Sequence, residues 1–337
     1  MIAAHLIKTG VIEFMDIPVP EPSEGEVLIK IKAALTCGTD LKAFQRGHPM
    51  IPMPGVFGHE FSGIVAKIGK GIKKFNSGDE VMTVHSAPCL KCRYCTIKEF
   101  NLCENIMRTK VLGAFAEYIL LPKHIVKQNL FHKPSNLNFE EAAFLEPLSC
   151  VVGGMRGLDI KKGDKALIIG TGPVGILHLS ILKMKGCHVT ITARKRSRLD
   201  FAKKMGADEA VEISNIEKAI EKITGGIGFD FVFECTGQLE VWENSVNHTR
   251  KGGTVILFGG VKSGTLACFD THKLHYDAIT LRGVFHFTPR DVKTAYKLLS
   301  EKINVSPLIS GHYPLKKLPI ALEKLSKGKG IKYAIIP

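Results

Sequence analysis

The sequence predicts a two-domain α/β protein that combines a β-rich domain with a doubly wound parallel sheet. Three observations predict this fold class. The chain has 337 residues, which is more than one hydrophobic core usually organises. Up to about residue 145, short β-prone runs are broken by Gly and Pro. From about Gly163 strands and helices alternate, which is typical of a parallel sheet.

The first region predicts an antiparallel, barrel-like domain. Its β-prone runs are EVLIKIKAAL, FSGIVAKIG, GDEVMTV and AFAEYILL. The last fifty residues contain one amphipathic helix (RDVKTAYKLLSEK), a proline-marked loop and a short terminal strand (YAIIP). Because this segment is too small to fold alone, we expect it to pack on the first domain. The expected boundaries are 1–147 for the first domain, 148–286 for the second and 287–337 for the returning segment.

Composition argues against several classes of protein. The formal net charge of +14 could indicate a polyanionic partner, but Lys and Arg are interleaved with acids along the chain, so we expect no nucleic-acid partner. No apolar run is long enough to cross a bilayer and the first residues lack signal-peptide features, so we expect no membrane partner and a cytoplasmic location. Nine cysteines in such a chain are expected to be thiols rather than disulfides.

A glycine-rich turn opens the second region. The stretch LIIGTGPVG places Gly170, Gly172 and Gly175 in G-x-G-x-x-G order between an apolar strand and an apolar-periodic helix. The first glycine allows a tight turn, the second lets a pyrophosphate approach the backbone, and the third lets the helix pack on the strand. With Pro173 and Val174, which lie between the second and third glycines, this turn predicts a dinucleotide site at a helix N-terminus.

The end of the next predicted strand indicates which dinucleotide to expect. NAD sites usually carry an acid there, but this chain has Ala193 followed by Arg194, Lys195 and Arg198, with no acid between residues 188 and 199. Guanidinium groups would bind a 2′-phosphate through charge-assisted hydrogen bonds. The sequence therefore predicts NADP(H), with Arg194 as the main ligand and Arg198 or Lys195 assisting. A merely solvated basic helix start is the alternative.

Four cysteines are closely spaced. Cys89, Cys92, Cys95 and Cys103 are separated by two, two and seven residues. Four thiolates on such a loop suit a closed tetrahedral zinc site, and an iron–sulfur cluster is the alternative. Because no coordination position would remain open, we expect this metal to be structural.

A second candidate metal set lies in the stretches TCGTD and GHEFSG, but spacing alone does not bring its residues together. The motifs CGTD, GHEFSGIVAKIG, GDEV, the cysteine loop, EPLS and GTGPVG occur in the order seen in zinc-dependent medium-chain alcohol and polyol dehydrogenases, which the whole chain resembles. The resemblance implies a GroES-like catalytic domain, a Rossmann domain, one catalytic and one structural zinc per chain, and a homodimer or homotetramer.

The resemblance also assigns site residues. Cys37 and His59 match the catalytic zinc ligands, and Glu60 and Glu146 match two acids that complete or adjust the ligand set. Which of the two acids binds zinc directly differs between family members and stays open here. Thr39 matches the hydroxyl that passes the substrate proton outward. Asp40, in the same stretch, resembles the acid that orients the histidine ligand.

Three positions bear on the substrate. Glu146 in FLEPLSC resembles the sorbitol (polyol) dehydrogenase branch, which includes an NADP(H)-using type with Ala-Arg at 193 and 194. Only nine residues separate Cys103 from Gly113, so a loop that lies near the substrate in sorbitol dehydrogenases is short here. His286 stands where those enzymes commonly have Arg. The last two departures weaken sorbitol itself as the substrate.

These observations predict a zinc-dependent oxidoreductase that transfers a hydride between NADP(H) and a secondary alcohol, polyol or sugar-derived ketone, with zinc as a Lewis acid. Thr236, Gly237 and Gly259 follow predicted strands and are expected to line the cofactor cleft. A polyol phosphate or a threonine-type amino alcohol is an alternative substrate, although EPLS argues against the second. The alternative of another class is a non-catalytic NADP(H)-binding or zinc-sensing protein.

Overall fold

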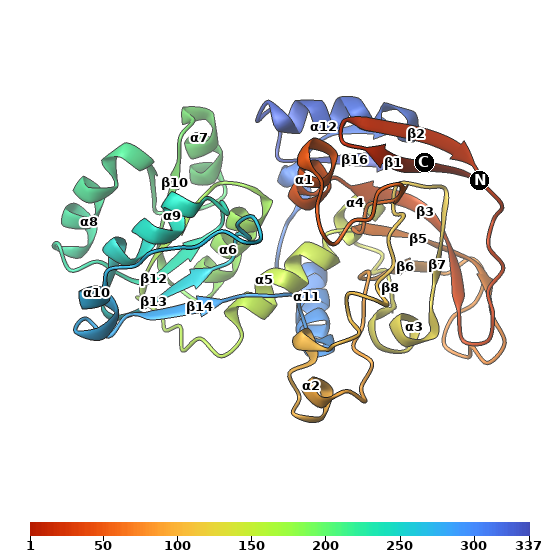
Figure 1. Ribbon diagram of the computed structural model, residues 1–337, viewed down its shortest axis with the longest axis horizontal. Coiled ribbons are helices and arrows are strands. Elements are labelled where there is room, and N and C mark those ends of the chain that lie inside the picture. Colours follow the sequence, from red (N-terminus) through yellow and green to blue (C-terminus); the bar gives the residue numbers. More distant parts are fainter. The chain divides into compact units, whose positions relative to one another are not determined.

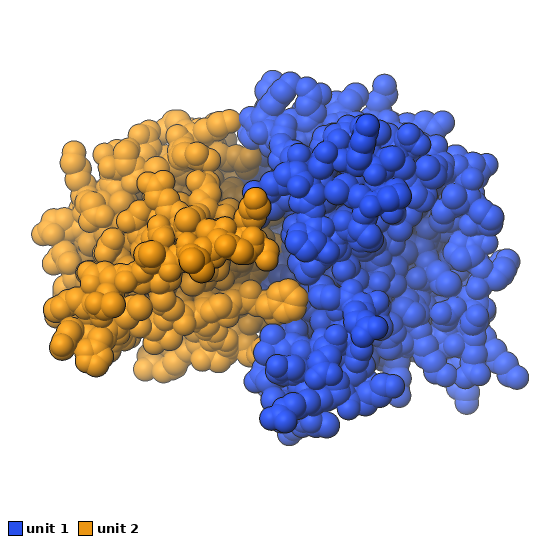
Figure 2. All heavy atoms as spheres, viewed as in Figure 1, with its two compact units in different colours: residues 1–152, 286–337 blue, residues 153–285 orange.

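The computed structural model describes residues 1–337 and divides them into two compact units (Figure 2). Unit 1 comprises Met1–Val152 and His286–Pro337, and unit 2 comprises Gly153–Phe285. The first unit is therefore assembled from both ends of the chain. No helix in either unit combines the length and apolar character that crossing a membrane requires.

Unit 1 is built on a mostly antiparallel sheet with the strand order β15-β16-β3-β5-β6-β8, in which β7 also pairs with β3 (Figure 1). Only β15 and β16 pair in parallel. A smaller sheet has the order β2-β1-β4. The strands are β1 (Ile2–Lys8), β2 (Val11–Asp16), β3 (Val27–Leu35), β4 (Gly55–Val56), β5 (Phe61–Ile68), β6 (Glu80–Met82), β7 (Tyr118–Leu121), β8 (Phe131–His132), β15 (Ile309–Pro314) and β16 (Lys332–Ile336).

The helices of unit 1 are short and connect or cover these strands. They are α1 (Gly38–Arg46), α2 (Arg93–Thr96), α3 (Lys123–Asn129), α4 (Phe139–Ala142), α11 (Pro289–Glu301) and α12 (Leu318–Ser326), and α5 (Leu145–Met155) lies at the boundary of the units. The predicted helix over 290–302 is confirmed as α11, which begins with a capping box between Thr288 and Asp291. Helix α12 lies where the sequence predicts a proline-marked loop, because proline is favoured in the first turn of a helix as well as in loops.

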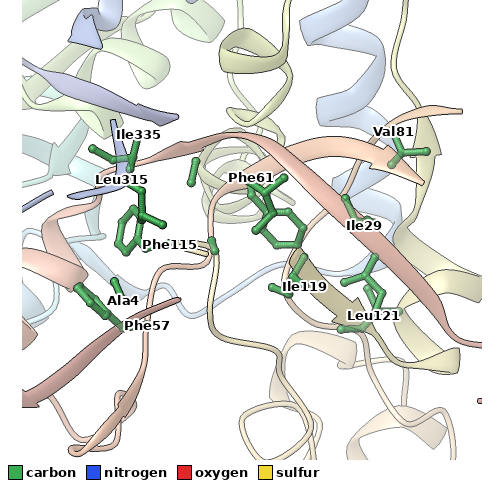
Figure 3. Close-up of a cluster of buried hydrophobic side chains, with 14 of the residues drawn as sticks. Ala4, Ile29, Phe57, Phe61, Val81, Phe115, Ile119, Leu121, Leu315 and Ile335 are labelled. Carbon is green, nitrogen blue, oxygen red and sulfur yellow. The ribbon is translucent and has the colours of Figure 1, made fainter. Parts of the chain in front are cut away.

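The hydrophobic core of unit 1 explains why the end of the chain returns to its beginning. Ile29 from β3 and Phe61 from β5 share one buried cluster with Leu315 and Ile335 from the C-terminal segment (Figure 3). Burying a side chain of this size contributes about 1.5–3 kcal/mol. The C-terminal segment therefore gains its stability from strands that precede it by more than two hundred residues.

Unit 2 contains a six-stranded parallel sheet with the order β11-β10-β9-β12-β13-β14. The direction of winding reverses between β9 and β12, and such a switch point is where doubly wound sheets bind ligands. The predicted fold class is confirmed. The strands are β9 (Lys165–Ile169), β10 (His188–Ala193), β11 (Glu209–Glu212), β12 (Phe229–Glu234), β13 (Thr249–Leu257) and β14 (Thr280–Gly283), and the helices are α6 (Pro173–Met184), α7 (Arg196–Lys204), α8 (Ile216–Thr224), α9 (Leu239–Asn244) and α10 (Thr271–His275).

Candidate active site

Cys37, His59 and Glu60 converge in unit 1. Their candidate ligand atoms all lie within 4.8 Å of one another. Cys37 caps the N-terminus of α1 directly after β3, and the other two residues directly precede β5. Because β3 and β5 are antiparallel neighbours, the end of one meets the start of the other, and the Leu35 N–H donates to the Glu60 carbonyl at 2.9 Å.

Asp40 holds the histidine of this set. Its Oδ1 lies 3.3 Å from His59 Nδ1, and the carboxylate is fully buried. Burial alone would lower the pKa of His59, but the negative charges of Asp40 and Cys37 raise it well above its ordinary value. The contact through Nδ1 leaves Nε2 as the free ring nitrogen, which is how a carboxylate orients a metal-binding histidine.

Glu60 is buried and only partly satisfied. One oxygen forms an ion pair with Lys332 of β16, whose Nζ also donates to the Thr36 carbonyl at 2.9 Å. The other oxygen, Oε1, has no hydrogen-bond partner. Burial raises the pKa of Glu60 despite the opposing charge of Lys332. A buried carboxylate oxygen without a partner, next to a thiol and an imidazole, suits a bound cation.

Glu146 lies near this set but is not a member of it. It stands in the first turn of α5, where its Oε1 accepts a hydrogen bond from the Cys150 thiol at 3.5 Å and lies 3.4 Å from His85 Nδ1. Burial, helped by the negative charge of Glu60, raises the pKa of Glu146 to about 7. Of the two acids carried over from the family, the structure therefore groups Glu60 with Cys37 and His59.

His85 and His286 extend the polar cluster, and His85 is not among the site residues that the sequence predicts. The His85 ring lies 5.2 Å from that of His59 and 5.4 Å from that of His286. His286 hydrogen-bonds Ser86 Oγ through Nε2 at 2.6 Å and has a φ of 59°, a strained value for a residue other than glycine. Burial lowers the pKa of His286 to about 3. Nothing in the local sequence around His85 signals this position.

The four cysteines of the 89–103 loop form a second set, with Sγ atoms that also lie within 4.8 Å of one another. Cys92 Sγ is 3.5 Å from Cys95 Sγ and 3.8 Å from Cys103 Sγ. Sulfurs around a tetrahedral zinc are about 3.8 Å apart, given a Zn–S distance of about 2.3 Å. Burial would raise the pKa of Cys89, but hydrogen bonds from the Lys91 main chain and the Asn105 amide lower it to about 6, which favours the thiolate.

The glycine-rich turn of unit 2 has the shape that the motif requires. Gly170 has a φ of 115°, which only glycine adopts easily. A Cβ on Gly175 would lie 2.0 Å from the Gly170 carbonyl oxygen, whereas a Cβ on Gly172 would meet nothing within 4 Å. Pro173 begins α6 and Val174 follows it. The third glycine is therefore needed for packing, and the second faces open space.

The strand β10 ends at Ala193, where the sequence predicts the cofactor-selecting position. Arg194 and Lys195 are exposed, and Arg198 is half-buried in the first turn of α7. One acid was missed because it is distant in sequence: Glu212, at the end of β11, is in register with Ala193. The structure therefore offers both basic groups and one carboxylate at this edge.

Glu234 is another residue that the sequence analysis did not single out. This buried carboxylate at the end of β12 accepts hydrogen bonds from the main-chain N–H groups of Thr236 and Gly237 at 2.6 and 3.0 Å. On the next loop, the Trp242 indole donates to the Gly259 carbonyl at 2.8 Å. The three residues predicted to line the cofactor cleft thus lie on loops that buried polar groups fix in place.

Comparison with known proteins identifies the family to which the whole chain belongs. Residues 23–131 match the model of the alcohol dehydrogenase GroES-like domain, and residues 173–301 match that of zinc-binding dehydrogenases. The sorbitol dehydrogenase of Halalkalibacterium halodurans is 31% identical over 338 residues, covering 98% of this chain and 96% of that protein. The chain belongs to the zinc-binding dehydrogenases.

Other relatives of this zinc-binding dehydrogenase also match over nearly the whole length of both chains. The D-arabitol-phosphate dehydrogenase of Enterococcus avium is 33% identical, covering 96% of this chain and 93% of that protein. The structure of a zinc-binding dehydrogenase from Sinorhizobium meliloti 1021 bound to NADP superimposes with a TM-score of 0.90 at 28% identity, covering 100% and 99% of the two chains. The resemblance found from the motifs is therefore confirmed.

Proposed function

We propose that this zinc-binding dehydrogenase transfers a hydride between NADP(H) and a secondary alcohol, polyol or sugar-derived ketone. The convergence of Cys37, His59 and Glu60, with Asp40 behind the histidine, carries the proposal. Three protein ligands leave a fourth position for a substrate oxygen, as catalytic zinc sites require. The sorbitol dehydrogenases among the relatives support a polyol.

The catalytic set fits zinc because it offers one thiolate, one imidazole and an unpartnered carboxylate oxygen. Bound there, zinc supplies Lewis acidity to the substrate oxygen. The chain's own residues do the rest: Asp40 fixes the His59 ring and Lys332 offsets part of the negative charge of Glu60. As the family resemblance implies, the hydroxyl of Thr39 would pass the substrate proton outward.

The cysteine set fits a second, structural zinc. Its sulfur separations match a single tetrahedral ion, whereas a multi-iron cluster would hold the four sulfurs further apart. We therefore propose two zinc ions per chain. We also propose a homodimer or homotetramer, as the family resemblance implies.

We propose NADP(H) rather than NAD(H) because the strand that precedes the basic cluster ends in Ala193 instead of an acid. Arg194 would bind the 2′-phosphate, with Lys195 or Arg198 assisting, and the S. meliloti relative binds NADP. Glu212 is the one nearby acid that would favour NAD(H), since its charge would repel the phosphate. One charge-assisted bond contributes about 1.5–3 kcal/mol, which corresponds to tenfold or more in affinity.

The test compares kcat/KM for NADP+ and NAD+ with a polyol panel, in the zinc-loaded protein and in Arg194→Ala. We expect a preference for NADP+ that falls about tenfold or more in the variant, because only NADP+ has the 2′-phosphate. Arg196→Ala is a matched control, since Arg196 is exposed and pairs with Asp200. Equal or better use of NAD+ by the unaltered protein would contradict the proposed cofactor.

The variant Cys37→Ser distinguishes an enzyme from a non-catalytic NADP(H)-binding or zinc-sensing protein. We expect this variant to lose hydride transfer while it keeps NADP+ binding, because the dinucleotide turn belongs to unit 2. Absence of turnover with the whole panel in the zinc-loaded, unaltered protein would favour the non-catalytic alternative.

A further inference from the structure

Lys110 brings a positive charge to the polar cluster beside the candidate metal set. It belongs to the short segment between Cys103 and Gly113, and its neighbour Val111 donates a main-chain hydrogen bond to the His85 carbonyl at 2.8 Å. This bond fixes the segment against the same His85 whose ring lies between those of His59 and His286. The main chain next to Lys110 is therefore held near the centre.

The ammonium of Lys110 has no acidic partner. Its one hydrogen bond goes to the Met107 carbonyl at 3.2 Å, and no carboxylate lies within ion-pair distance. Lys110 is half-buried, and burial lowers its pKa. The fully buried Lys332, by contrast, is compensated by Glu60. A partly desolvated cation without a counter-ion is costly unless a ligand supplies the negative charge.

The end of α1 adds to this positive region. Phe44 of α1 and Val111, next to Lys110, pack against the same hydrophobic cluster of unit 1. Burial, helped by the charges of Lys42, His59, Lys110 and Arg46, lowers the pKa of His48, in keeping with this packing. Both segments carry positive charge, and His286 adds a neutral ring that hydrogen-bonds Ser86.

We propose that Lys110 binds the phosphate of a phosphorylated polyol whose reacting carbinol lies at the Cys37, His59 and Glu60 set. The inference rests on the proposed function and narrows its substrate class. Arg46 contributes long-range attraction from the exposed end of α1, and the half-buried His286 ring, which the buried Ser86 holds, offers a neutral polar group to substrate hydroxyls. A phosphate suits this position because a dianion gains most from a partly desolvated ammonium.

The experiment measures binding by calorimetry, and turnover with NADP+, in the zinc-loaded full chain. The probes are D-sorbitol and D-arabitol, D-sorbitol 6-phosphate and D-arabitol 5-phosphate, and D-gluconate as a carboxylate. We expect the phosphates to bind about tenfold or more tightly than the plain polyols, and Lys110→Met to abolish that difference while affinity for plain polyols changes less than twofold. Lys110→Arg should retain most of it.

Arg108→Met is the matched control, because Arg108 is an exposed cation in the same segment. Thermal unfolding and zinc content check that each variant folds. As a second measurement, inorganic phosphate should compete with D-sorbitol at saturating NADP+ in the unaltered protein and not in Lys110→Met.

The proposal is overturned if phosphates bind no better than polyols, if Arg108→Met has the same effect as Lys110→Met, or if D-gluconate is the preferred anion. Lys110-dependent phosphate binding without any hydride transfer would instead overturn the proposed function and leave this inference standing. Turnover of plain polyols together with phosphate binding that does not depend on Lys110 would overturn this inference and leave the proposed function standing.

Discussion

Gly172 and Gly175 of the same turn are required for different physical reasons, and one substitution at each position distinguishes these reasons. Gly175→Ala places a methyl group 2.0 Å from a backbone oxygen, so α6 must move away from β9. We expect a loss of about 1–3 kcal/mol in the free energy of unfolding of unit 2. Gly172→Ala meets open space at a φ of −75°, so it should cost less than about 1 kcal/mol but hinder a pyrophosphate.

Urea unfolding and NADP+ titration of both variants check this pair. The expected pattern is that Gly172→Ala weakens NADP+ binding with little loss of stability, while Gly175→Ala loses stability. If both variants lost stability equally, the assignment of the second glycine to ligand approach would be wrong.

Asp208 gives unit 2 a pH-dependent contribution to stability. Burial would raise its pKa, but hydrogen bonds from Lys183 and the Val189 N–H, each as short as 2.6 Å, lower it. A carboxyl whose folded-state pKa is lowered stabilises the fold above its unfolded pKa of about 3.9, and this stabilisation is lost as the pH falls through the lower folded value. Asp208→Asn should therefore destabilise unit 2 at pH 7 and have a shrinking effect below about pH 4.

Urea unfolding from pH 7 to pH 3 measures this difference. Asp200→Asn serves as a surface control, since the exposed Arg196–Asp200 pair should be worth at most about 1 kcal/mol. An Asp208→Asn effect that stays constant down to pH 3 would contradict the assigned hydrogen bonds.

At the scale of elements, we expect the cysteine loop to depend on its proposed metal more than any other segment. Helix α2 has four residues and the adjoining hydrophobic cluster is small, so neither could order the loop alone. We expect Cys95→Ser to lose one of two zinc ions per chain and to make residues 89–110 sensitive to protease, while the sheet of unit 1 persists.

Metal analysis and limited proteolysis check the cysteine loop. Cys268→Ser is the control, because Cys268 is exposed and belongs to neither donor set. Two retained zinc ions and an unchanged cleavage pattern in Cys95→Ser would show that these thiols do not hold a metal.

The elements that could be predicted from the sequence are those that a short run of neighbouring residues determines. The β10 strand end at Ala193, α11 and the glycine turn follow from runs of fewer than fifteen residues. The exposure of Cys268 could not be predicted, because a single small apolar residue in a loop carries no periodic signal. Similarly, α12 and β15 were missed within a segment marked only by prolines.

At the scale of the whole molecule, the missed residues are those that the tertiary fold brings together. Lys332 meets Glu60 across 272 positions, and Ser86 meets His286 across 200. Charge and periodicity in a short window cannot indicate such pairs, because each depends on which strands become neighbours. The family resemblance supplied Cys37, His59 and Glu60, and the register of β3 with β5 supplies the physical reason that they meet.

The position of Lys332 has a consequence for how this protein is made. Synthesis runs from the N-terminus toward the C-terminus, so an emerging chain exposes Glu60 long before the strand that neutralises it exists. Until β16 docks beside β3, the buried Glu60 carboxylate lacks the ammonium of Lys332. The candidate metal set should thus reach its final arrangement only after β16 has been made, later than the sheet of unit 2.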